Sequence, residues 1–360
     1  MKKILCLIDR LSFGGAERQL IGLAILLKQK GYDVEMATYH DFDFDTKVIE
    51  TKIIPLHRIS QKSNPISKLL AVRKLINKQQ YDVVIAYKSG VTMLACILKM
   101  FGGKFRLIVS ERNTTQALTH RERLKFWLYS YADVIIPNSY TQEEFIKGHY
   151  PSLNKKTFTI TNFTNTTCFT PCDDTKANSK LQILTVARLA TQKNVIRYIE
   201  AVKKVRDTGV NVVFHWYGNV QIQQDDYALQ CKKRVKELGL ADVFEFHPAT
   251  SDILSEYQKC DIFCLPSLYE GYPNVVCEAM SCGKPVLCSR VCDNPYIVED
   301  GGNGMMFNPL DEEDIAQSII KMCKLSEEQR ASMGRRSRKI AEEKFSVETF
   351  VNQYINLIEA

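Results

Sequence analysis

Short, continuously apolar runs alternate with longer amphipathic segments along most of this sequence. Residues 3–8 form one apolar run, a loop with Gly14 and Gly15 follows, and residues 16–30 carry apolar side chains at helical spacing. This order predicts a strand, a loop and a helix. Because strands that are apolar on both faces belong to parallel sheets covered by helices, the alternation predicts an α/β protein with doubly wound parallel sheets.

This alternation of strand and helix patterns occurs in two parts of the chain. In the first, it predicts further strands at 34–38, 83–86, 107–110 and 134–137, with helices at 66–77 and 122–131. In the second, it predicts strands at 183–187, 212–217, 243–246, 262–265 and 285–288, with helices at 194–206, 226–238, 253–258 and 274–282. Three helices, at 312–324, 327–344 and 347–358, are expected to finish the chain.

A polar stretch separates these two parts, and 360 residues are too many for one hydrophobic core. We predict an N-terminal domain at 1–165, a linker at 166–180 and a C-terminal domain at 181–345. Ligands of open parallel sheets bind outside the carboxyl ends of the strands, so the expected site is a cleft between the two domains.

The charge is uneven along the chain. Residues 1–170 contain 25 Lys and Arg against 14 Asp and Glu, whereas the remainder contains 23 against 27. A basic N-terminal half is typical of proteins that meet an anionic membrane surface or nucleic acid, and it is equally compatible with a solvated surface.

The chain shows no sign of export. No apolar run reaches the length of a membrane-spanning helix, and Asp9 and Arg10 interrupt the apolar start without a cleavage site after them. The twelve cysteines are scattered through apolar segments, which favours reduced, buried thiols over disulfides. We therefore expect a cytoplasmic protein.

The densest functional signal is the segment 266–285, PSLYEGYPNVVCEAMSCGKP. Glu270 lies in a loop after a predicted strand, Pro273 can begin the next helix, and Glu278 lies inside that helix. The helix N-terminus favours a phosphate, and the two carboxylates can accept hydrogen bonds from sugar hydroxyls. The pattern predicts a sugar-nucleotide site.

This segment closely resembles the Glu-x7-Glu signature of family 4 glycosyltransferases, retaining enzymes with two Rossmann-like domains in the GT-B fold. The segments at 14–18 (GGAER), 188–194 (RLATQKN) and 297–304 (IVEDGGNG) resemble further parts of the same family, in order and at suitable spacings. The resemblance implies a GT-B fold, with the last helix, about 346–360, packing back on the N-terminal domain.

The resemblance also implies roles. Glu278 would bind the ribose of the donor, Glu270 the transferred sugar, and Arg188 and Lys193 the diphosphate, where charge builds up as the glycosidic bond breaks. The remaining donor-binding candidates contribute backbone contacts: Gly14, Gly15, Gly271, Tyr272, Pro273, Asn274 and Val275. The implied reaction is a same-face displacement that needs neither a metal nor another cofactor.

Two further segments leave alternatives open. Many relatives carry a His where this chain has Arg112, so Arg112 is a candidate for contacting the sugar or an acceptor phosphate, with Glu111 and His120 nearby, or else for a structural ion pair. Asp41, Asp43 and Asp45 mimic a metal motif, but we interpret them as an acidic loop.

Segments 68–78 and 121–127 alternate basic and apolar residues. Such a pattern suits a helix lying on an anionic bilayer, and equally a helix packed on a sheet.

We therefore predict a hexosyltransferase that moves a sugar from a nucleotide-diphosphate donor to a glycan in cell-surface polysaccharide assembly. The donor is expected to be UDP-linked, and the resemblance implies a lipid-linked glycan. The enzyme is expected in the cytoplasm, with the inner face of the membrane as an additional location, and without a nucleic-acid partner. The alternatives are a sugar-nucleotide epimerase of the same fold and a non-catalytic protein that binds a membrane or nucleic acid through its basic half.

Overall fold

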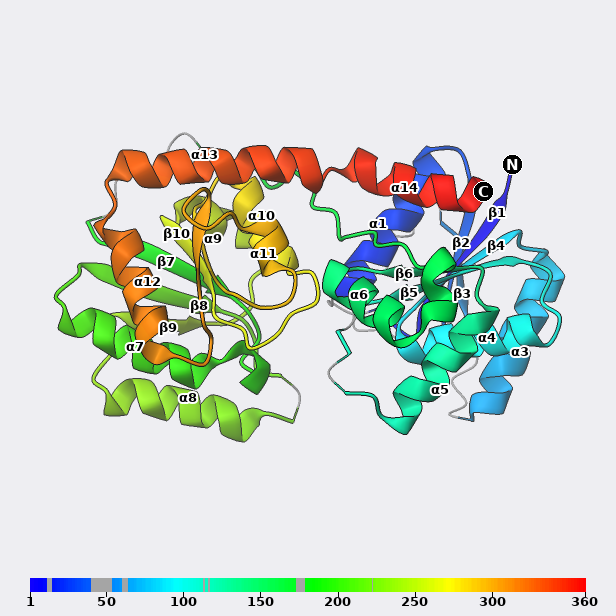
Figure 1. Ribbon diagram of the computed structural model, residues 1–360, viewed down its shortest axis with the longest axis horizontal. Helices are drawn as coiled ribbons and strands as arrows, with labels where there is room; N and C mark the ends of the chain where they lie inside the picture. Colours follow the sequence, from blue (N-terminus) through cyan, green and yellow to red (C-terminus); the bar gives the residue numbers. More distant parts are fainter. Residues whose placement is uncertain are drawn as a thin grey trace. The chain divides into compact units, whose positions relative to one another are not determined.

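The computed structural model describes residues 1–11, 15–39, 54–59, 64–112, 114–115, 117–172, 179–221 and 223–360. These residues form two compact units. The first contains Met1–Asn162 together with Glu348–Ala360, and the second contains Phe163–Val347. Each unit is a parallel sheet with helices around it (Figure 1).

The sheet of the first unit has the strand order β3-β2-β1-β4-β5-β6, with all pairs parallel. Its strands are β1 (Lys3–Leu7), β2 (Asp33–Thr38), β3 (Leu56–Arg58), β4 (Val83–Tyr87), β5 (Arg106–Glu111) and β6 (Val134–Pro137). The order reverses between β1 and β4, and the loops that follow these two strands therefore meet at one edge of the sheet.

Three helices of the first unit begin at residues whose side chains cap them. Asn64 accepts a hydrogen bond from the Ile66 amide at the start of α3, and Thr119 and Ser139 do the same for α5 and α6. The helices are α1 (Gly15–Gln29), α3 (Pro65–Gln79), α4 (Ser89–Met100), α5 (His120–Leu128), α6 (Tyr140–His149) and α14 (Val347–Glu359).

The C-terminal helix α14 belongs to the first unit. The hydroxyl groups of Tyr87 and Tyr354 lie 2.8 Å apart in the core, and Arg106 Nε donates to the Leu357 carbonyl at 2.8 Å. These contacts join α14 to β4 and β5, as the family resemblance implied.

The sheet of the second unit has the order β12-β11-β10-β7-β8-β9, again entirely parallel. Its strands are β7 (Leu181–Val186), β8 (Val212–Tyr217), β9 (Phe244–His247), β10 (Ile262–Leu265), β11 (Val286–Ser289) and β12 (Gly304–Phe307). Here the order reverses between β7 and β10, and β9 is an edge strand.

The second unit has seven α-helices in its described part. They are α7 (Val195–Asp207), α8 (Asp225–Glu237), α9 (Ile253–Lys259), α10 (Asn274–Ser281), α11 (Asn294–Ile297), α12 (Glu312–Lys324) and α13 (Glu327–Lys344). Helix α12 packs beside α7, and α13 packs against α10 (Figure 1).

A glycine makes the contact between α13 and the end of α10 possible. A Cβ atom at Gly334 would lie 2.1 Å from the carbonyl oxygen of Gly283, closer than two such atoms can approach. Arg338 on the same helix donates to the Ser281 carbonyl at 2.6 Å and to the Phe169 carbonyl at 2.8 Å. Helix α13 thus holds the carboxyl end of α10 in place.

The prediction of two doubly wound parallel sheets is confirmed. The sequence pattern missed β3, whose residues Leu56, His57 and Arg58 form no apolar run, and it left β12, α4, α6 and α11 unassigned. All twelve cysteines are free, and eight of them are buried. Among the described residues, no helix combines the length and apolar character that crossing a bilayer requires.

Candidate active site

The loop between β10 and α10 is tied to the loop that follows β7. The amide of Leu268 donates to the Gln192 carbonyl at 2.9 Å, and Gln192 Nε2 donates to the Tyr269 carbonyl at 2.7 Å. These two loops leave the sheet at the point where the strand order reverses. Their position is the one at which open α/β sheets bind ligands.

A lysine–glutamate pair joins the same two loops. Lys193 Nζ lies 2.5 Å from Glu270 Oε1, and the two side chains are only 13% and 11% exposed. Lys193 ends a short 3-10 helix, Thr191–Lys193, and the next residue, Asn194, has a left-handed backbone with φ of 60°. Asn194 Nδ2 donates to the Pro309 carbonyl at 2.7 Å, which fixes this turn.

Helix α10 carries the second carboxylate. Pro273 caps its N-terminus, Asn274 begins it, and Glu278 lies one turn further on, almost fully buried. The hydroxyl of Tyr257 donates to Glu278 Oε2 at 2.9 Å. The N-terminus of a helix carries a partial positive charge, so the start of α10 at Asn274 and Val275 is suited to an anion.

The other predicted donor contacts of this unit follow from the same loop. Tyr272 is buried, with its ring edge-on to Phe345 at a centroid distance of 6.0 Å, so it contributes packing and a backbone amide. Gly271 lies directly between Glu270 and Tyr272. Arg188 follows β7, and its side chain is exposed to solvent.

A close approach of two strands sets the position of Arg188. A Cβ atom at Gly218 would lie 2.0 Å from the Ala187 carbonyl oxygen, which also accepts a hydrogen bond from Trp216 Nε1 at 2.8 Å. The end of β7 is therefore held against the end of β8. This leaves the guanidinium of Arg188 free to turn toward a ligand at the carboxyl edge of the sheet.

This constellation can bind an anion and sugar hydroxyls. Lys193 and the α10 N-terminus offer positive charge, while Glu270 and Glu278 offer acceptors. A buried cation held by a carboxylate is already oriented, so less freedom is lost when a phosphate binds. The structure pairs Lys193 with Glu270, and Glu278 lies on the helix that follows the same loop, where it accepts from Tyr257.

The structure describes one of the two predicted glycines. Gly15 begins α1, whereas Gly14 lies outside the described residues, as do Asp41, Asp43 and Asp45.

The sequence analysis missed a lysine at the carboxyl end of the first sheet. Lys88, directly after β4, pairs with Glu17 at 2.7 Å and with Asp9 at 2.9 Å. Burial alone would lower the pKa of Lys88, but hydrogen bonds and charges from Glu17 and Asp9 raise it above its usual value. A charged residue immediately after an apolar strand was the signal that could have found it.

Arg112 is held by side chains of its own unit. Its guanidinium lies over the Tyr87 ring, 4.2 Å from the centroid, donates to the hydroxyl of Tyr87, and also donates to Tyr354 and Asn162, both at 2.8 Å. Of the two alternatives for Arg112, this geometry favours a structural one, in which cation–π and hydrogen-bond contacts replace the ion pair that was considered.

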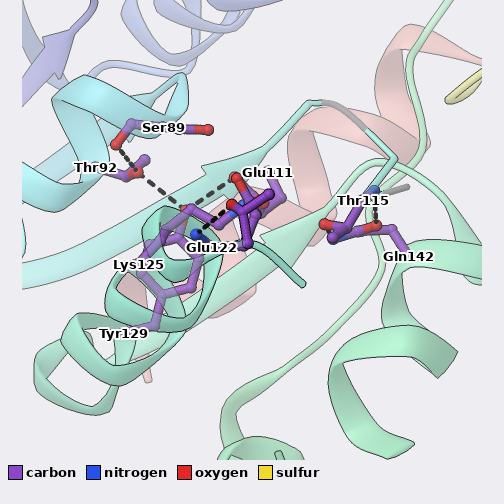
Figure 2. Close-up of polar contacts among 9 residues, drawn as sticks. Ser89, Thr92, Glu111, Thr115, Glu122, Lys125, Tyr129 and Gln142 are labelled. Carbon is purple, nitrogen blue, oxygen red and sulfur yellow. Dashed lines mark hydrogen bonds and ion pairs between the residues drawn. The ribbon is translucent and has the colours of Figure 1, made fainter. Parts of the chain in front are cut away.

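Glu111 is not available to a ligand. It is 1% exposed, forms an ion pair with Lys125 and accepts a hydrogen bond from the Tyr129 hydroxyl at 2.9 Å. Lys125 also pairs with Glu122 at 2.5 Å (Figure 2). The idea that Glu111 accepts from an acceptor substrate is therefore wrong, because its oxygens serve this buried network. His120, the fallback, is exposed at the start of α5.

Two protein-family models of sugar-transferring enzymes match the chain. The model "Glycosyltransferase Family 4" matches residues 13–167, and the model "Glycosyl transferases group 1" matches residues 173–340.

Curated relatives carry related names. The chain is 26% identical over 306 residues to N-acetylgalactosamine-N,N'-diacetylbacillosaminyl-diphospho-undecaprenol 4-alpha-N-acetylgalactosaminyltransferase of Campylobacter jejuni, covering 80% of this chain and 81% of the relative. It is 25% identical to UDP-Gal:alpha-D-GlcNAc-diphosphoundecaprenol alpha-1,3-galactosyltransferase of Escherichia coli, covering 71% and 70%. Among solved structures, Anabaena HepE in complex with UDP and glucose is similar over 100% of both chains, with a TM-score of 0.88 and 21% identity.

Proposed function

Because the chain belongs to the family 4 glycosyltransferases, we propose that it is a retaining hexosyltransferase that uses a UDP-sugar and extends a lipid-linked glycan for a cell-surface polysaccharide. The observation that carries this proposal is the pairing of Lys193 with Glu270 at the switch point of the second sheet, beside Glu278 on α10.

Each of these groups has a task in the transfer. Glu278, oriented by Tyr257, accepts hydrogen bonds from the ribose, and Glu270 accepts from a hydroxyl of the transferred sugar. Lys193, Arg188 and the first-turn amides of α10 stabilise the negative charge that grows on the leaving diphosphate.

The displacement takes place on one face of the sugar. The acceptor oxygen bonds to the anomeric carbon as the bond to the diphosphate oxygen breaks, and the proton of the acceptor hydroxyl passes to the departing diphosphate. The reaction requires no protein nucleophile, and we propose that it proceeds without a metal or another cofactor.

A groove in the first unit supports the lipid-linked acceptor. It has a volume of about 540 Å³ and lies between α3 and α4, with a mainly apolar lining. Its charged residues are Lys68, Lys88, Arg121 and Asp9, of which Asp9 pairs with Lys88 at 2.9 Å. Apolar walls with cations among them suit a molecule that joins a hydrocarbon chain to a diphosphate. The names of the Campylobacter and Escherichia relatives both specify diphospho-undecaprenol-linked sugars.

We also propose that the first unit meets the anionic inner face of the cell membrane. Ile66 and Leu70 on α3 and Leu124 and Trp127 on α5 are exposed apolar side chains that alternate with basic residues. Burial of such side chains in a bilayer surface gains free energy, and lysines and arginines beside them are attracted to anionic lipids.

The test of the proposed function is calorimetric titration of the purified protein with UDP, GDP, ADP and NAD, repeated on Glu278→Ala. We expect UDP alone to bind tightly and the substitution to weaken it at least tenfold, because a hydrogen bond to a charged group contributes about 1.5–3 kcal/mol. Glu327→Ala, which removes an exposed carboxylate of α13, is the matched control and should bind UDP unchanged.

Product analysis then separates transfer from its alternatives. The protein is incubated with UDP-hexoses and UDP-N-acetylhexosamines, with and without a polyprenyl-diphosphate-linked sugar. A new α-linkage from an α-linked donor, formed only with the acceptor, is expected. Interconversion of the UDP-sugar without acceptor would identify an epimerase, and a folded protein that binds none of the nucleotides would overturn the proposal.

A further inference from the structure

Three potential metal ligands lie on one face of β8 and β9. The strands are paired in parallel, with His215 opposite Glu245 and Tyr217 opposite His247. Because alternate residues of a strand face the same side, Glu245 and His247 share a face, and the His215 side chain meets them from the neighbouring strand. Among the described residues, this is the one group of three or more His, Cys, Asp or Glu ligand atoms that lie close enough to share an ion.

The three ligand atoms form a nearly equilateral triangle. His215 Nδ1 lies 3.1 Å from His247 Nε2 and 3.5 Å from Glu245 Oε2, and His247 Nε2 lies 3.3 Å from the same oxygen. Ligands bound tetrahedrally to Zn²⁺ at 2.0–2.1 Å are separated by about 3.3–3.4 Å. An ion placed over this triangle would therefore reach all three atoms at normal coordination distances without a rearrangement of the strands.

The imidazole of His215 is oriented for coordination. Its Nε2 lies 2.6 Å from Gln182 Oε1 on β7. An amide oxygen only accepts, so His215 Nε2 must carry the proton and Nδ1 keeps its lone pair toward the triangle. Metal-bound histidines usually donate their second nitrogen in this way.

The imidazole of His247 is held by stacking. It lies on the Tyr217 ring with a centroid distance of 4.3 Å and an interplanar angle of 15°. The Tyr217 hydroxyl in turn donates to Glu256 Oε2 at 2.8 Å, which links this ring to α9. Both histidines are thus positioned by neighbours that do not themselves belong to the triangle.

The ligand set indicates the class of ion. Two imidazole nitrogens and one carboxylate suit Zn²⁺ and neighbouring transition metals, whereas Ca²⁺ and Mg²⁺ prefer oxygen ligands alone. Glu245 is about half exposed, which gives an ion access and leaves a fourth position to water. We propose that His215, Glu245 and His247 form a binding site for a divalent transition-metal ion, of which Zn²⁺ is the first candidate.

Such an ion would link the edge strand β9 to β8 beside the carboxyl end of the sheet. This role is structural and is independent of the proposed sugar transfer, since Lys193 and Glu270 follow β7 and β10 instead. The site was invisible in the sequence because His215 and His247 are 32 residues apart and meet only through the register of two strands.

The experiment uses the full chain, purified without a histidine tag and stripped with a chelator. Zn²⁺ alone is titrated calorimetrically, and Co²⁺ alone is followed by its visible absorption, which reports tetrahedral coordination. The unchanged chain is compared with His247→Gln and Glu245→Gln. His149→Gln, which removes a histidine at the end of α6 in the first unit, is the matched control.

We expect one Zn²⁺ per chain and a loss of affinity of about tenfold or more in each site variant, while the control binds as the unchanged chain does. Zn²⁺ should also raise the melting temperature of the unchanged chain and the control only. Absence of binding to the unchanged chain, or binding to both site variants as tight as to the unchanged chain, would overturn the proposal. Glu245→Gln keeps the test valid if His247→Gln does not fold, because the Glu245 side chain is half exposed.

Discussion

Lys193 and Glu270 form an ion pair with little access to water, so the removal of one partner leaves the other charge uncompensated. We predict that Lys193→Met lowers kcat/KM about 10²–10³-fold, because a cation that stabilises the leaving diphosphate acts mainly in the transition state. Steady-state kinetics with a UDP-sugar measure the loss of kcat/KM, and calorimetry with UDP measures how much of it is weaker binding of the nucleotide. Lys233→Met, on the exposed face of α8, is the control.

The pairing also predicts how the double variant behaves. In Lys193→Met/Glu270→Gln no buried charge is left unpaired, so its melting temperature should exceed that of Lys193→Met while its activity stays low. Full activity of Lys193→Met would show that Lys193 serves only to neutralise Glu270.

Arg112, directly after β5, connects this strand to α14 through hydrogen bonds to Tyr87 and Tyr354. We predict that Arg112→Met destabilises the first unit by about 2–4 kcal/mol, because it removes several buried hydrogen bonds and a cation–π contact. Denaturant unfolding measures this loss, with Arg123→Met, an exposed arginine of α5, as the control. If stability is unchanged while kcat falls, Arg112 contacts substrate instead.

Glu35 links three strands of the first sheet. It accepts from the hydroxyl of Tyr81 at 2.5 Å, lies 2.5 Å from His57 Nε2 on β3 and pairs with Lys3 on β1 at 3.0 Å. Burial alone would raise the pKa of Glu35, but the hydrogen bonds from Tyr81, His57 and Lys3 and the charge of Lys3 outweigh it, and the pKa lies below 4.5.

A lowered carboxyl pKa stabilises the fold at pH values above 4.5, and this contribution is lost as the pH falls through the folded pKa. We predict that the denaturation midpoint of the unchanged chain drops more steeply below pH 4.5 than that of Glu35→Gln. Denaturant titrations at several pH values check this. Parallel pH profiles for the two chains would show that Glu35 does not contribute.

Which features of the protein could be predicted depended on the distance along the chain between the residues involved. The β10–α10 loop was recognisable because Glu270, Pro273 and Glu278 lie within nine residues, and apolar runs revealed most strands. The contact of Tyr87 with Tyr354 spans 267 residues, and the site at His215 and His247 depends on strand register. Such contacts follow from tertiary packing, which no local pattern encodes.

The excess of basic residues in the N-terminal half leads to the last prediction. The full chain should co-sediment, through its first unit, with vesicles that contain phosphatidylglycerol. It should do so less at 1 M salt, where the Debye length falls to about 3 Å. Leu124→Ser/Trp127→Ser removes two exposed apolar side chains of α5 and should weaken binding about tenfold or more, since each buried side chain contributes about 1.5–3 kcal/mol.

A matched substitution tests whether the location of these side chains matters. Leu229 is as exposed as they are but lies on α8 in the second unit, so Leu229→Ser should leave vesicle binding unchanged. Equal loss in both variants would point to nonspecific adsorption of apolar surface. Binding that depends on salt but not on Leu124 and Trp127 would mean that the basic residues act without insertion of α5, and the helix would then be a solvated one that packs on the sheet through Phe126 and Leu128.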